Sequence, residues 1–310
     1  MSSIASDYLY IFSTTPPRVL YLYPIILGCG FPTTSSNQRA PFRLLALGDP
    51  QLEGDSSLPE QHDGFSARFK RIYGNPELQH ASARERPNSA QSELKSFFAL
   101  DVPLLLRLLR KKIDLFGNDY YLAHIYRTLH TYLEPTHVVV LGDLIGSQWI
   151  SDEEFSHRGH RYWDRVFNHG QRVEDEITNG QWRTTLESES SWKHRIINVV
   201  GNHDIGYAGD MTEERITRFE KMYGKANWDT IFTLSSPKFA TGDHPELRLI
   251  ILNTLNMDVP VLSPSLQSQT YGFINSAIGA SSPVEDTTSA TILLTHLPST
   301  KTKASALIRQ

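Results

Sequence analysis

Four short apolar segments in this chain end in the same way, and this repeated pattern limits the possible fold more than any other feature. Residues 197–200 are a Val/Ile-rich run that leads into Gly201, Asn202, His203 and Asp204. A run of this kind, closed by a glycine, is typical of a strand that is covered on both faces. Taken alone, the polar residues could equally form a turn in which Asn and Asp side chains bond to their own backbone.

The other three segments also end in side chains that can bind metal. They are residues 42–47 before Gly48, Asp49 and Gln51, residues 136–141 before Gly142 and Asp143, and residues 291–295 before His296. In an open α/β sheet the carboxyl ends of the strands meet at one edge, so these side chains are expected to converge there. The sequence therefore predicts an α/β fold with a metal site at that edge.

The residue types fit the hydrolysis of a phosphate ester by two divalent ions. Such ions neutralise the phosphoryl oxygens and supply a hydroxide at neutral pH. Asp143, on the middle motif, is the candidate to bridge both ions. Asp49 and Gln51 would complete the first site, and Asn202 and His296 would serve the second.

Two further residues are candidates for proton transfer. His203 follows a predicted ligand directly and so points in another direction, and an imidazole can pass a proton near neutral pH. It is the candidate general acid for the leaving oxygen. Asp204 is expected to orient His203 or the turn rather than to bind metal.

These motifs resemble the calcineurin-like metallophosphoesterase family, whose pattern runs D-x-H, G-D, G-N-H-[DE], a lone His and then G-H-x-H. The resemblance spans about residues 41–298 and implies a four-layer α/β/β/α sandwich with two divalent metal ions. Gln51 replaces the family's first His, which favours a hard ion such as manganese, with zinc or iron as alternatives. No G-H-x-H follows His296, so we expect a C-terminally incomplete domain, either truncated or degenerate, that binds metal weakly.

Helper motifs lie at residues 117–122, 141–146, 151–155, 200–206 and 218–220. Together they are similar to the fungal secretory-pathway phosphoesterases that remove ethanolamine phosphate from glycosylphosphatidylinositol (GPI) anchors. This resemblance implies a phosphodiester on a mannose of the GPI-anchor glycan as substrate, and a catalytic domain on the lumenal side of the endoplasmic reticulum membrane. A non-catalytic trafficking or binding factor with this fold is the alternative, and a nuclease or nucleotidase is a second one.

The composition narrows these alternatives. The formal net charge is −4 and no dense Lys/Arg run occurs, so the chain lacks the electrostatic footprint of a nucleic-acid-binding protein. Cys29 is the only cysteine, which excludes an intramolecular disulfide and a cysteine-based zinc site.

The predicted organisation has two parts. Residues 1–40 form an apolar segment and linker, in which residues 8–31 are either a membrane anchor or an N-terminal arm. Residues 41–310 form the catalytic domain, with a polar inserted loop at about 53–91. Helical spacing follows the insert from Pro103, with a break expected at Gly117.

Overall fold

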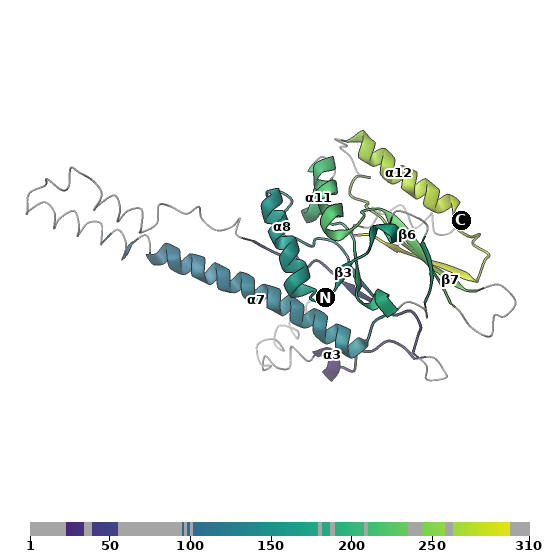
Figure 1. Ribbon diagram of the computed structural model, residues 1–310, viewed down its shortest axis with the longest axis horizontal. Coiled ribbons are helices and arrows are strands. Elements are labelled where there is room, and N and C mark those ends of the chain that lie inside the picture. The colour runs from purple at the N-terminus through teal and green to yellow at the C-terminus, as the bar shows by residue number, and fades with distance from the viewer. Residues whose placement is uncertain are drawn as a thin grey trace, which may run out of the picture. The chain divides into compact units, whose positions relative to one another are not determined.

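The computed structural model describes residues 23–33, 39–54, 95, 98–99, 102–178, 182–186, 190–207, 210–234, 244–257 and 263–297 (Figure 1). The chain divides into two compact units, one of residues 1–53 with 119–310 and one of residues 54–118. All the predicted site residues belong to the first unit. Apart from Glu53 and Gly54, the predicted loop at 53–91 lies outside the described residues.

The first sheet is parallel throughout, in the order β1-β2-β5-β3. Its strands are β1 (Leu44–Leu47), β2 (His137–Val140), β5 (Arg195–Asn198) and β3 (Gln171–Arg172). Every residue of β2 and β5 is buried, as predicted for strands covered on both faces. However, β5 begins two residues before the predicted run at 197–200 and includes the polar Arg195 and Asn198. Leu47 pairs with Val140, and Val140 with Asn198, so β1, β2 and β5 end side by side.

The second sheet is mixed, in the order β4-β6-β7-β8, with only β6 and β7 antiparallel. Its strands are β4 (Trp182–Thr185), β6 (Trp228–Thr233), β7 (Glu246–Ile251) and β8 (Ser289–Leu294). The prediction that all four motif strands share one sheet edge is therefore wrong for β8. Its Thr-Ile-Leu-Leu pattern indicates a strand but carries no information about which sheet the strand joins.

Helices cover the outer face of each sheet, which confirms the predicted four-layer α/β/β/α sandwich. One core cluster joins Val138 and Val140 of β2 to Phe155 of α8 (Asp152–Arg161) and Phe219 of α11 (Glu213–Tyr223). The neighbouring Val139 points the other way, into a second cluster with Phe232 and other residues of the second sheet. On the far side, α12 (Pro264–Gly279) contacts β7 through the bond from Arg248 to the carbonyl of Ala277 (2.8 Å). Figure 1 shows α8 and α11 beside each other and α12 along the sheet of β6 and β7.

Side chains cap the N-termini of two helices. Ser151 Oγ accepts from the backbone of Glu154 (3.3 Å) at the start of α8, and Thr212 caps α11 in the same way. The remaining short elements are α3 (Tyr23–Ile26), η3 (Tyr162–Val166), α9 (Asp175–Thr178), η4 (Ser190–Lys193) and α10 (Asn202–Ile205).

Helix α7 (Val102–Leu133) continues through Gly117, so the predicted break there is wrong. A glycine inside a helix costs only about 1 kcal/mol relative to alanine. The part of α7 that follows Gly117 is held in place by packing, because Ala123 and Tyr126 are buried in the core.

Arg161 of α8 binds both residues that flank the second unit. Its Nε and one terminal nitrogen donate to the two carboxylate oxygens of Asp119 (2.8 and 2.7 Å), and its other terminal nitrogen donates to the carbonyl of Glu53 (2.6 Å). Asp119 is almost fully buried. We call this arrangement the Arg161 clasp. The chain thus leaves the first unit and re-enters it at one guanidinium group.

The predicted apolar segment at 8–31 is described only from Tyr23 onward. There, α3 is a single turn of helix, and residues 25–30 are exposed. In the part of the chain with described coordinates, no helix combines the length and apolar character that crossing a bilayer requires.

Candidate metal centre

The turns that follow β1 and β2 hold three predicted ligands in an unusual backbone conformation. Asp49, Gln51 and Asp143 have φ of 39°, 41° and 48°. Few non-glycine residues adopt this left-handed region, and such residues cluster at functional sites. The two turns also bond to each other, because the backbone nitrogen of Gln51 donates to the carbonyl of Asp143 (2.9 Å).

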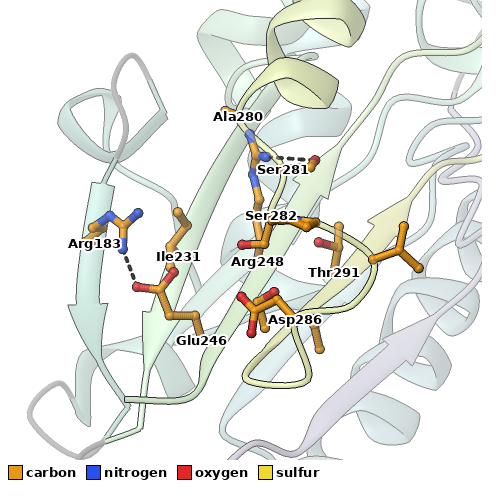
Figure 2. Close-up of a pocket in the computed structure, with 13 residues that line it drawn as sticks. Arg183, Ile231, Glu246, Arg248, Ala280, Ser281, Ser282, Asp286 and Thr291 are labelled. Carbon is orange, nitrogen blue, oxygen red and sulfur yellow. Dashed lines mark hydrogen bonds and ion pairs between the residues drawn. The ribbon is translucent and has the colours of Figure 1, made fainter. Parts of the chain in front are cut away.

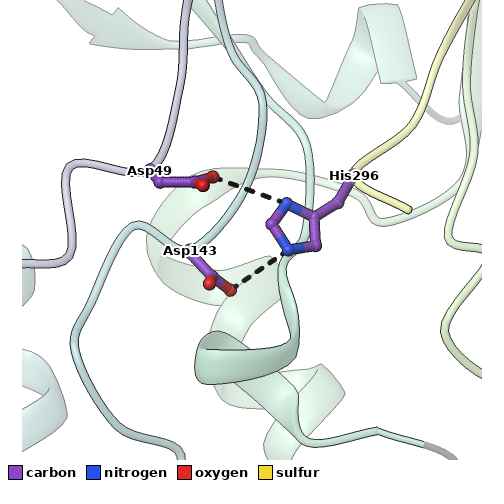
Figure 3. A group of neighbouring side chains, drawn as sticks. All are labelled: Asp49, Asp143 and His296. Atoms are coloured by element: carbon purple, nitrogen blue, oxygen red, sulfur yellow. Dashed lines mark ion pairs between the residues drawn. The ribbon is translucent and has the colours of Figure 1, made fainter. Parts of the chain in front are cut away.

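Figure 3 shows His296 facing both Asp49 and Asp143. Asp143 also contacts other candidate site residues. Its Oδ1 accepts from the backbone of His203 (2.9 Å) and lies 3.5 Å from His296 Nε2, while its Oδ2 accepts from the side chain of Gln51 (3.2 Å). Asp49 Oδ1 lies 3.7 Å from His296 Nδ1. One ligand atom each from Asp49, Asp143 and His296 fall within 4.8 Å of one another.

His296 is oriented as a metal ligand would be. Its Nδ1 lies 2.7 Å from the carbonyl oxygen of Leu141, and a carbonyl only accepts, so Nδ1 carries the proton. In a neutral imidazole, Nε2 then has a free lone pair, and it lies 3.1 Å from Asn202 Oδ1. Metal-binding histidines commonly donate their other ring N–H to a backbone carbonyl in this way.

This donor set fits a divalent ion. His296 Nε2, Asn202 Oδ1 and Asp143 Oδ1 are all lone-pair atoms, and Nε2 lies 3.1 and 3.5 Å from the other two. Neighbouring ligands of one ion, with bonds of about 2.1 Å, lie roughly 3 Å apart. Asp49 and Gln51 belong to the first motif, which is predicted to complete the other metal site. The amide nitrogen of Gln51, rather than its oxygen, faces the carboxylate of Asp143. In this geometry Gln51 orients Asp143.

Asp204 holds the turn that presents Asn202 and His203. It is completely buried, and its two oxygens accept from the backbone nitrogens of Gly201 (2.8 Å) and Ile145 (3.1 Å). Burial raises the pKa of Asp204 well above its usual range and the nearby charge of Asp143 raises it further, whereas these amide bonds lower it. Asp204 is predicted either to orient His203 or to hold the turn, and these bonds support the second role.

His203 lies at the edge of the cluster with its side chain partly exposed. Its Nε2 is 3.8 Å from Asp143 Oδ2. Its Nδ1 is buried and has no hydrogen-bond partner among the described residues. A ring that is fixed through its backbone but leaves both nitrogens without close hydrogen bonds can still donate a proton to a substrate.

Two glycines allow the loops to approach each other. A Cβ on Gly142 would lie 2.5 Å from His296 Nδ1, and one on Gly201 would lie 2.0 Å from the backbone nitrogen of Asp143. Gly142 also has a φ of 97°. The glycine in each of these motifs is therefore a spatial requirement of the site.

The loop after Asp143 is anchored by Arg218, a residue of the helper motif at 218–220. Its guanidinium donates to the carbonyls of Gln148 (2.9 Å) and Ile150 (3.0 Å). Trp149, the residue between Gln148 and Ile150, is 67% exposed. The guanidinium of Arg215 lies 4.5 Å from the centroid of the Trp149 ring. Sequence reasoning missed Trp149, because a single tryptophan in a loop has no distinguishing pattern.

A second hollow lies at the opposite end of β8 from His296 (Figure 2). Its charged groups already have partners in the protein. Arg183 pairs with Glu246, and Arg248 donates to Asp229 Oδ2 (2.7 Å) and to Ser281 Oγ (3.4 Å). With its charges paired internally, this hollow offers none of the chemistry found at Asp143.

Comparison with known proteins gives three relevant relatives. The chain is 31% identical to Protein TED1 of Saccharomyces cerevisiae over 321 aligned residues, which cover 90% of this chain and 62% of that protein. It is 23% identical to an uncharacterised protein of Schizosaccharomyces pombe, over 77% of this chain and 42% of the relative. It is 28% identical to Metallophosphoesterase 1 of Rattus norvegicus, over 47% of this chain and 31% of that protein. The chain thus spans less than two thirds of each relative. No family model matches the sequence.

Proposed function

Since the chain belongs to the metallophosphoesterase family, we propose that it hydrolyses a phosphodiester with two divalent metal ions. The observation that carries this proposal is the convergence of Asp49, Asp143, Asn202 and His296 from two sheets, with three lone-pair atoms directed at one another. Uncompensated lone pairs at such distances repel each other, and a cation among them would replace repulsion by coordination.

Each residue of the site has a separate proposed role. When bound, the ions would neutralise the phosphoryl oxygens and lower the pKa of a water molecule. Asp143 would contribute to both sites, Asn202 and His296 would hold the second ion, and Asp49 would supply the second negative charge of the first site. His203 donates a proton to the leaving oxygen, and the buried Asp204 keeps that turn in place.

For the substrate, we propose ethanolamine phosphate on a mannose of the GPI-anchor glycan. This assignment is supported by the helper motifs, whose residues have physical roles here. Asp119 of the first motif receives the Arg161 clasp, and Arg218 of the last motif anchors the loop that carries Trp149. Trp149 follows Asp143 by six residues in the chain, and an exposed aromatic ring of this kind is suited to packing against the apolar face of a sugar.

The proposed metal is manganese, because the donors are carboxylate and amide oxygens with a single imidazole. Such hard ligands favour manganese or magnesium over zinc. The proposed location is the lumenal face of the endoplasmic reticulum membrane, where a GPI-anchored substrate would be encountered.

The test uses the full chain with manganese and two substrates, a nitrophenyl phosphodiester and a synthetic mannoside that carries ethanolamine phosphate. Because the sequence predicts weak metal binding, we expect only slow release of ethanolamine phosphate, and we expect Asp143→Asn to abolish it. Asp175→Asn, which removes the same charge from a half-exposed residue paired with Arg172, should leave the activity unchanged. Manganese binding without hydrolysis of either substrate would overturn the proposal in favour of a non-catalytic binding factor. Cleavage of single-stranded DNA instead would favour a nuclease.

A further inference from the structure

The first part of α7 exposes a continuous apolar face. Leu105, Leu106, Leu109, Ile113 and Phe116 are 55%, 61%, 56%, 61% and 54% exposed. Because successive helix residues are rotated by about 100°, these five lie within an arc of roughly 100°. A surface-exposed aliphatic row of this length is unusual for a soluble protein and marks an interaction surface. We call it the α7 apolar face.

Basic residues border this face on both sides. By the same rotation, Lys112 lies next to Leu105 on one border, and Arg110 lies next to Leu106 on the other. Arg107 and Lys111 lie on the opposite side of the helix. Arg107, Arg110 and Lys112 are exposed. Asp114 is the only acidic residue in this part of the helix and lies 3.8 Å from Arg110.

We propose that the α7 apolar face binds to the surface of an anionic lipid bilayer. An apolar face bordered by long basic side chains matches an interface in which aliphatic groups enter the acyl region and cations remain among anionic headgroups. The basic side chains of the helix favour an anionic membrane over a second copy of the chain. A second copy of the chain would bring like charges together at both borders, whereas an anionic membrane pairs with all of them. This proposal does not depend on the proposed function.

The first experiment is flotation of the full chain with vesicles of phosphatidylcholine, with or without phosphatidylserine. We expect binding that requires phosphatidylserine and weakens as salt is added. Each basic side chain near an anionic surface is worth about fivefold in partitioning, so replacing Arg110 and Lys112 by Gln should weaken binding by about 25-fold. Leu105→Gln with Leu109→Gln should weaken it as well. Ile278→Gln, at an apolar side chain of α12 that is 67% exposed, is the matched control and should have no effect.

The second experiment places an environment-sensitive fluorophore on the helix, which separates this face from any other lipid contact. In a Cys29→Ser background, a label on Leu109→Cys should shift to the blue with anionic vesicles, while a label on Arg107→Cys should not. The absence of a shift at position 109 would overturn the proposal even if the chain binds vesicles. Self-association without lipid that is lost in the Leu105→Gln, Leu109→Gln variant would also overturn it, in favour of a second copy as the partner.

Discussion

We expect the three glycines that precede predicted ligands to respond differently to alanine, although they look alike in sequence. A Cβ on Gly201 would lie 2.0 Å from the backbone nitrogen of Asp143 and 2.3 Å from its Oδ1. A Cβ on Gly142 would lie 2.5 Å from Nδ1 of His296. A Cβ on Gly48 would meet no atom within 4 Å.

The magnitudes follow from these contacts. Ordinary contact of a Cβ begins at 3.4 Å, so Gly201→Ala must displace a carboxylate loop that already bonds to its neighbours. Overpacking of this kind costs about 1–3 kcal/mol of folding free energy. A shift of about 1 Å at a reacting group can reduce the rate about 100-fold. Gly142→Ala has the further strain of a positive φ. Gly48→Ala should remain within about 1 kcal/mol of the wild type.

The assays are urea unfolding for the free energy of unfolding and calorimetric titration with manganese for metal affinity. Gly201→Ala and Gly142→Ala should lose both stability and affinity, and Gly48→Ala should lose neither. If Gly48→Ala were as damaging as Gly201→Ala, or if Gly201→Ala bound manganese as the wild type does, the described packing of the two loops would be refuted.

Three further predictions concern single side chains. Asp143→Asn should reduce manganese binding more than Asn202→Ala, because Asp143 is the candidate to bridge both ions; calorimetry that gave equal losses would contradict this proposal. His203→Ala should retain metal and lose about 10²–10⁴-fold in rate with a poor alkoxide leaving group, but less with nitrophenolate, and equal losses on both would exclude a general acid. Burial and Arg43 lower the pKa of His137 to about 3. As the pH falls below about 6.5, only the unfolded state takes up this proton, so the folded state should lose about 2 kcal/mol between pH 7 and pH 5, and urea unfolding should show that His137→Phe removes this loss.

The clustering of the candidate ligands could be predicted because each one follows an apolar strand, and this local pattern survives folding. The residues that each candidate ligand contacts could not be predicted. The sequence pattern of β8 does not specify its sheet, and His296 reaches Asn202 from the second sheet only through three-dimensional packing. The motif glycines show the same limit, since Gly48 and Gly201 differ only in what lies opposite them in space.

Asp204 illustrates a second limit. Its position beside His203 in sequence made a role in orienting the imidazole or in the turn equally reasonable. The bond to Ile145, a residue of another motif, depends on the parallel pairing of β2 with β5, which local sequence does not encode.

The Arg161 clasp bears on how proteins of this kind can diverge. Because Glu53 and Asp119 are held by one guanidinium, the loop after β1 and the second part of α7 are joined at one point on α8. Insertions or deletions between those two residues would leave this joint and the candidate ligands of the first unit unchanged. The region can thus acquire new binding partners through insertions and deletions while the ligand-bearing strands continue to evolve under the separate constraint of catalysis.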